Sequence, residues 1–168
     1  MIETIADVEG DPRERVLLVL LPPAFGTAQE FVDHGFLTAV RPAARVVGVE
    51  PETSAFMAAS LDAGRLVEID ERETIADAVA GGIEPGSITF PICRDLVDAI
   101  EVVPEALIAR GLALVEALHG RIVEGAGALP FAAMLHSPAK WAGRTVVAVV
   151  SGGNIAPERF RAVVAAPR

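Results

Sequence analysis

The sequence has 168 residues, enough for one domain with its own core but not for two domains of ordinary size. Apolar residues make up 52% of the chain and charged residues 22%, a balance typical of a globular protein rather than a disordered one. The net charge of −9 comes from 23 acidic and 14 basic residues, and the basic residues are scattered. This argues against a nucleic-acid partner, which requires a clustered basic face.

The chain opens on an acidic stretch, and its longest apolar run, Val16–Leu21, follows and leads into two prolines. This run is far shorter than the roughly 20 residues that span a bilayer. An acidic opening also differs from the basic start of a signal peptide. A single cysteine, Cys93, excludes an internal disulfide and fits a reducing compartment. We therefore expect a cytoplasmic protein without a membrane partner.

Four short apolar runs predict β-strands. Val16–Leu21, Arg45–Val49 and Thr145–Val150 are rich in β-branched residues and nearly continuous in apolar character. Such runs are typical of strands that are buried on both faces. Ala99–Val102 is a weaker fourth candidate.

Stretches with helical periodicity lie between these runs. Gln29–Val40 and Pro104–Leu118 place apolar residues at steps of three and four, and Pro104 suits the first turn of a helix. Glu124–Met134 is rich in alanine and glycine and is interrupted by Pro130. It predicts a short, closely packed helix.

Strands that alternate with helices predict the α/β fold class, with a three-layer, Rossmann-like parallel sheet and helices on both faces. We expect residues 1–12 to form a flexible terminal segment and residues 13–168 to form a single α/β domain. Gly81–Ser87 is the main internal loop.

The strongest local signal is Ser151–Asn154, which follows the last predicted strand and precedes a short helix from Pro157. Ligands bind beyond the carboxyl ends of strands in open α/β sheets, and Gly152 and Gly153 would let the backbone approach a ligand closely. The hydroxyl of Ser151 could bond a heteroaromatic nitrogen. Taken alone, these residues favour an ordinary glycine turn capped by Ser151 and Asn154.

The loop after the first predicted strand contains Gly26 and Thr27 just before a predicted helix. A helix N-terminus offers free amide groups to a phosphate. Thr27 is more typical of a helix N-cap, so both interpretations stay open.

Two other kinds of site are disfavoured. His34, His119 and His136 have no His, Cys or carboxylate partner at a metal-ligand spacing. Ser137–Lys140 matches the S-x-x-K pattern of serine β-lactamases, but the companion triplets are absent and the stretch is expected to be a loop.

From Arg41 to about Val164 the sequence resembles threonine dehydratases and serine racemases, the fold type II pyridoxal-phosphate enzymes of the tryptophan synthase beta superfamily. Five segments carry the resemblance in order: Arg41–Glu52, Glu73–Asp77, Thr89–Val97, Val123–Gly127 and Val149–Asn154. The resemblance implies pyridoxal 5′-phosphate as cofactor and a lyase that releases ammonia from L-threonine or L-serine by β-elimination. A small hydroxy amino acid would then be the substrate.

The resemblance also implies roles for particular residues. Ser151 would hydrogen-bond the pyridine nitrogen of the cofactor, and a neutral hydroxyl there suits β-elimination. Gly152, Gly153 and Glu124 would lie close to the cofactor. Glu50 matches a carboxylate that binds a divalent cation in several members, but Phe56 replaces its acidic partner, which argues against a metal.

Two departures concern the cofactor itself. The family holds the phosphate in a run of four glycines, and the matching slot here, Phe25–Ala28, keeps only Gly26, with Thr27 beside it. The family's lysine that holds the cofactor covalently lies in an N-terminal segment without counterpart here. The only lysine, Lys140, stands at a non-equivalent place. We therefore expect no catalytic residue among those present.

Two hypotheses about function stay open. The first is a catalytically deficient partial or recombined dehydratase domain that lacks the family's N-terminal half. The second is a non-enzymatic α/β scaffold or interaction module, chimaeric with residues 16–40, which resemble the opening strand, loop and helix of α/β-hydrolases. In either case an exposed sheet edge predicts a homo-oligomer.

Overall fold

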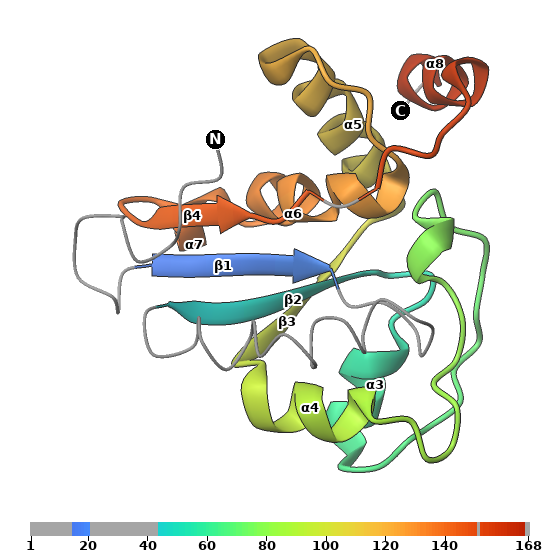
Figure 1. The fold of residues 1–168 in the computed structure, drawn as a ribbon, viewed down its shortest axis with the longest axis vertical. Helices are drawn as coiled ribbons and strands as arrows, with labels where there is room; N and C mark the ends of the chain where they lie inside the picture. Colours follow the sequence, from blue (N-terminus) through green and yellow to red (C-terminus); the bar gives the residue numbers. More distant parts are fainter. Residues whose placement is uncertain (1–14, 21–43, 151, 167–168) are drawn as a thin grey trace.

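The computed structural model describes residues 15–20, 44–150 and 152–166 (Figure 1). Its centre is a sheet of four parallel strands, in the order β3-β2-β1-β4. The strands are β1 (Arg15–Leu20), β2 (Arg45–Pro51), β3 (Ala99–Val103) and β4 (Thr145–Ala148). All four predicted strands and their parallel arrangement are confirmed, although the last strand ends two residues earlier than predicted.

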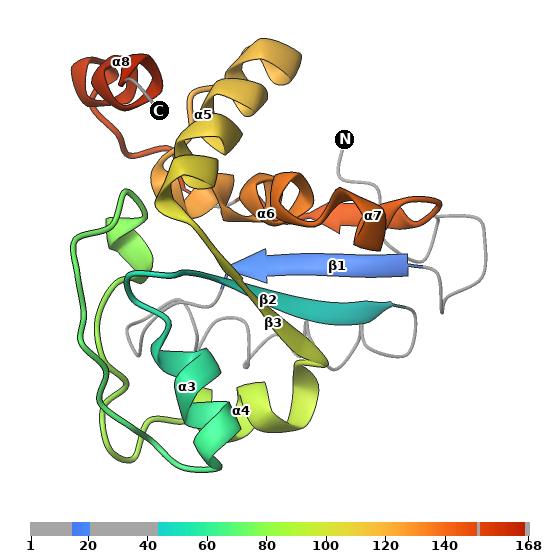
Figure 2. The same ribbon diagram turned by 180° about the vertical axis from the view of Figure 1, so that it is seen from behind.

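Helices cover both faces of the sheet, as predicted (Figures 1 and 2). One face carries α3 (Phe56–Ala63) and α4 (Thr89–Leu96). The other carries α5 (Glu105–His119), α6 (Gly125–His136) and the single turn α7 (Pro138–Trp141), with α8 (Pro157–Ala165) packed beyond α5; a 3-10 turn, η3 (Asp77–Val79), lies near the carboxyl ends of the strands. Within the described residues, no helix is long and apolar enough to cross a membrane.

The side chains of β2 show why most of this strand is apolar. Val46 packs with Ile92 and Leu96 of α4. The next residue, Val47, belongs to the opposite layer together with Ile108. Successive side chains of a strand point to opposite faces, so a strand between two helical layers is buried on both faces, as β2 is at every position after Arg45.

Helix α5 follows the predicted periodicity, but Pro104 is its N-cap rather than a residue of its first turn. The helix ends at Gly120, which has a left-handed φ of 60° that favours glycine. Gly111 lies where α5 packs on α6, because a Cβ at this position would stand 2.9 Å from the carbonyl oxygen of Ala128.

The short, closely packed helix predicted after α5 is confirmed as α6, and two details of this segment differ from the prediction. Pro130 does not interrupt α6, which runs through it for 12 residues. A proline within a helix removes one hydrogen bond, but burial of every residue from Gly125 to Ala133 offsets that loss. Ser137–Lys140 is not a loop, since α7 begins at Pro138, and Trp141 anchors the turn through its indole N–H, which donates to the Ala133 carbonyl at 3.0 Å.

Candidate functional site

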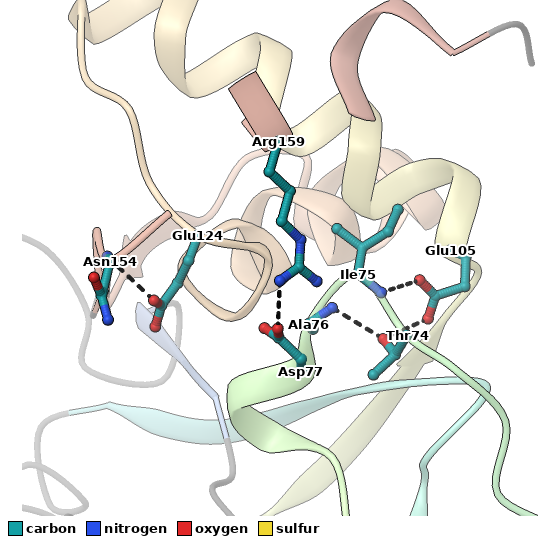
Figure 3. Close-up of polar contacts among 8 residues, drawn as sticks. All are labelled: Thr74, Ile75, Ala76, Asp77, Glu105, Glu124, Asn154 and Arg159. Atoms are coloured by element: carbon teal, nitrogen blue, oxygen red, sulfur yellow. Dashed lines mark hydrogen bonds and ion pairs between the residues drawn. The ribbon is translucent and has the colours of Figure 1, made fainter. Parts of the chain in front are cut away.

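Three segments meet beside the carboxyl ends of the strands: residues 74–77, the start of α6, and the loop after β4 (Figure 3). Of the residues expected to contact a ligand, Glu124, Gly152 and Gly153 lie here. Ser151, Gly26 and Thr27 lie outside the described residues, as does the predicted helix Gln29–Val40.

Glu124 is hydrogen-bonded to the glycine loop after β4 through its backbone and its side chain. Its amide N–H donates to the Gly152 carbonyl at 3.4 Å, and its Oε2 accepts the Asn154 amide N–H at 3.2 Å. Gly152 has a left-handed φ of 85°, and a Cβ there would overlap the Glu124 carboxylate. The left-handed φ favours glycine here, and the absence of a side chain leaves room for the Glu124 carboxylate.

Gly125, the first residue of α6, makes a second close backbone approach. A Cβ on Gly125 would overlap the carbonyl of Ile75 and stand 2.8 Å from the Ala76 amide nitrogen. A side chain at this position would therefore force the two segments apart. Gly125 joins residues 74–77 to Glu124 through backbone packing alone.

The structure adds polar residues that the sequence analysis missed (Figure 3). Glu105 accepts hydrogen bonds from the Thr74 hydroxyl at 2.6 Å and the Ile75 amide N–H at 2.8 Å. Asp77 pairs with Arg159 of α8 at 2.8 Å, with both side chains about half exposed. These partners are about 30 and 80 residues apart, so no local motif could reveal them.

Glu50 lies at the end of β2, where it caps α3. Its carboxylate accepts the amide N–H groups of Met57 at 3.0 Å and Ala58 at 2.8 Å. Burial raises its pKa to about 7, against the opposing effect of these two hydrogen bonds. Among the residues that the structure describes, no group of three or more His, Cys, Asp or Glu side chains could hold a metal ion. The metal role of Glu50 therefore stays an expectation of the resemblance.

Lys140 lies away from these loops. It belongs to α7, near the amino end of β1 and opposite the arrowheads of the strands (Figures 1 and 2). Its ammonium group contacts the Glu101 carboxylate. Partial burial and the nearby Arg45 and Arg144 lower the pKa of Lys140 despite that ion pair. The helix that carries this lysine and the glycine loop therefore lie at opposite ends of β1 (Figures 1 and 2).

The sequence comparisons point to one family. A family model described as pyridoxal-phosphate dependent enzyme matches residues 24–152. A putative threonine dehydratase of Sinorhizobium fredii is 37% identical over 150 residues, which cover 89% of this chain and 45% of the relative. The L-threonine ammonia-lyase of Geobacter sulfurreducens is 38% identical over 133 residues, which cover 77% of this chain and 33% of the relative.

Solved structures agree with these matches. A threonine deaminase from T.th. has a TM-score of 0.71 at 33% identity, covering 86% of this chain and 51% of that protein. Maize serine racemase has a TM-score of 0.71 at 26% identity, covering 87% of this chain and 45% of that protein. The chain spans between a third and about half the length of the relatives that it matches.

Proposed function

The chain belongs to the family of pyridoxal-phosphate-dependent enzymes, and from that premise we propose that it forms the ring-binding side of a threonine or serine dehydratase site. The cofactor would be pyridoxal phosphate, and the substrate class would be small hydroxy amino acids. The relatives named threonine dehydratase and L-threonine ammonia-lyase support this class. The whole activity is part of the proposal, because the chain spans at most about half of their length.

One observation carries the proposal: the glycine loop after β4 faces Glu124 at the carboxyl ends of the strands. A flat aromatic ring needs backbone without side chains beside it, and Gly152 and Gly153 supply such backbone. In the proposal, this loop and Glu124 lie beside the ring of the cofactor. In the proposal, the Ser151 hydroxyl bonds the ring nitrogen and Glu124 keeps the loop in place.

When bound, pyridoxal phosphate supplies an electron-withdrawing ring that stabilises negative charge at the substrate Cα. A neutral hydroxyl at the ring nitrogen leaves that nitrogen unprotonated, which favours β-elimination over reactions that need a stronger electron sink. The chain's own part is to bind and orient the ring. Lys140, the sole lysine, belongs to α7 and pairs with Glu101 in the middle of β3. Proton removal at Cα would therefore depend on a lysine from another polypeptide segment.

The test uses phosphopyridoxyl-L-serine, a stable reduced adduct of cofactor and substrate that needs no lysine for binding. We expect calorimetry to detect binding, and the melting temperature to rise with adduct concentration, because a ligand of the native state stabilises it. Ser151→Ala should weaken binding about tenfold, the effect of one lost hydrogen bond in a buried site. Ser137→Ala, at the start of α7, is the matched control and should bind like the wild type.

Absence of binding, or equal binding by Ser151→Ala, would remove this proposal and leave the non-enzymatic scaffold. Pyridoxal phosphate itself must be tested with Lys140→Ala in parallel, because the free aldehyde reacts with any accessible amine. An absorbance band that disappears in Lys140→Ala would report only this side reaction.

We further propose self-association, as the sequence analysis expected. Val102 in β3 and Val150 just beyond β4 are 37% and 46% exposed. These two strands form the edges of the described sheet. Exposed apolar side chains at sheet edges favour pairing with another chain. Light scattering coupled to gel filtration should find a species larger than 17.5 kDa. A strictly monomeric protein at high concentration would contradict it.

A further inference from the structure

Glu105 connects three segments of the chain through one carboxylate. Its Oε1 accepts the hydroxyl hydrogens of Thr53 and Thr74, both at 2.6 Å, and its Oε2 accepts the Ile75 amide N–H at 2.8 Å. Thr53 follows β2, Thr74 and Ile75 precede η3, and Glu105 is the first residue of α5. Charge-assisted hydrogen bonds of this kind are the stronger ones in proteins, so the carboxylate fixes the segments relative to α5.

The segment that Glu105 holds has no regular structure between residues 73 and 76. The Thr74 hydroxyl group donates one hydrogen bond to Glu105, and its oxygen also accepts the Ala76 amide N–H at 3.0 Å. Thr74 therefore passes the restraint on to Ala76, which is fully buried. The Glu105 carboxylate and the Thr74 hydroxyl thus restrain the backbone from Thr74 to Ala76.

The start of α6 packs directly on residues 74–76. Ile75 and Ala76 present their backbone to Gly125 so closely that no side chain fits between them. Gly125 follows Glu124, whose carboxylate meets Gly152 and accepts the Asn154 amide N–H. A shift of residues 74–76 would therefore move Glu124 and, with it, the glycine loop.

We propose that Glu105 is a positioning residue of the cofactor site: it sets residues 74–76, which set Gly125 and Glu124 against the loop at Gly152. Within the described part of the chain, its carboxylate acts on the site through these residues. The role in cofactor binding rests on the proposed function, whereas the effect on the loop does not.

The first test is independent of the cofactor. Amide signals of uniformly nitrogen-15-labelled protein are compared between the wild type, Glu105→Ala and Thr74→Val. We expect the Gly152 and Asn154 signals to move by more than their linewidths in both variants, and the Arg144 signal at the other end of the sheet to stay in place. Glu116→Ala, at an exposed position on the same helix, is the matched control and should leave all of these signals unchanged.

The second test measures binding of phosphopyridoxyl-L-serine and the fluorescence of the bound ring below the melting temperature of every variant. Glu105→Ala should weaken binding about tenfold and alter the ring emission, since the loss of several ordered bonds leaves the loop less restrained. Thr74→Val should act in the same direction.

The outcomes separate the two ideas. If the wild type fails to bind the adduct, the proposed function fails, and the amide signals still decide whether Glu105 positions the loop. If Glu105→Ala only lowers the melting temperature, with loop signals and ring emission as in the wild type, the positioning role is overturned. If Glu105→Ala does not fold, Thr74→Val decides by the same readouts.

Discussion

The carboxylate of Glu50 accepts the amide N–H of Ala58 at 2.8 Å, so a side chain from the end of β2 caps the first turn of α3. The helix has no side-chain cap of its own, because its N-cap residue is Ala55. A buried carboxylate in this position is costly when charged, and burial raises its pKa to about 7. Folding is therefore linked to the protonation of this group.

The protein should lose stability between pH 4.5 and 7. The carboxyl group binds its proton more tightly when folded, so its contribution is complete below the ordinary pKa of 4.5 and is lost as pH rises to about 7. The linked free energy is on the order of 3 kcal/mol for this 5%-exposed side chain. Urea unfolding followed by the fluorescence of buried Trp141 at pH 5 and pH 8 measures it.

Glu50→Gln should remove this pH dependence, because an amide does not titrate in this range. Glu116→Gln, at an exposed position of α5, is the control and should keep the dependence of the wild type. The assignment to Glu50 would be wrong if Glu50→Gln and the wild type lost the same unfolding free energy between the two pH values.

The thiol of Cys93 should be inert in the folded protein. Burial, helped by the charge of Glu50, raises its pKa to about 12 from 9.0. Because the thiolate is the reactive form, the folded protein at pH 8 should react with Ellman's reagent roughly a thousandfold more slowly than the unfolded chain. Reaction traces with and without urea give both rates; comparable rates would contradict the burial of Cys93.

Gly125→Ala should destabilise the protein by about 2 kcal/mol, the usual cost of forcing extra atoms into packed structure. Its new methyl group would overlap the Ile75 carbonyl. Gly153→Ala is the matched control, because its nearest contact would be the Ile122 carbonyl oxygen at 3.5 Å. The control should stay within about 0.5 kcal/mol of the wild type. Urea midpoints compare the two, and equal midpoints would show that residues 74–76 yield easily.

The ion pair between Asp77 and Arg159 should add little to stability. The side chains are 55% and 54% exposed, and such pairs contribute at most about 1 kcal/mol. A double-mutant cycle of Asp77→Asn and Arg159→Gln should give a small coupling energy. This energy should vanish in 1 M salt, because the Debye length there is only about 3 Å and exposed charges are strongly screened. A coupling above about 2 kcal/mol at high salt would mean that water is excluded from the pair.

The strands and α5 could be predicted because their burial requires apolar residues at regular positions in a contiguous stretch of sequence. Arg45–Val49 lies between two helical layers, so both of its faces are apolar, and α5 buries one stripe at helical spacing. The order of five family-like segments likewise indicated a pyridoxal-phosphate enzyme, which the family match from residue 24 to residue 152 confirms. The roles of Ser151, Gly26 and Thr27 stay predictions, since these residues lie outside the described part.

The sequence by itself thus determined the strands, their parallel α/β arrangement and the family, all of which leave periodic or contiguous patterns in the chain. Only the tertiary structure decided that Glu105 holds Thr74 and Ile75, that Gly125 must be glycine, and that Glu50 caps a helix instead of standing free. It also decided that α6 continues through Pro130. The physical reason is the same in each case: these contacts join groups whose partner is chosen by the packing of elements in space, and a hydrogen bond across 30 residues imposes no spacing on the sequence between them.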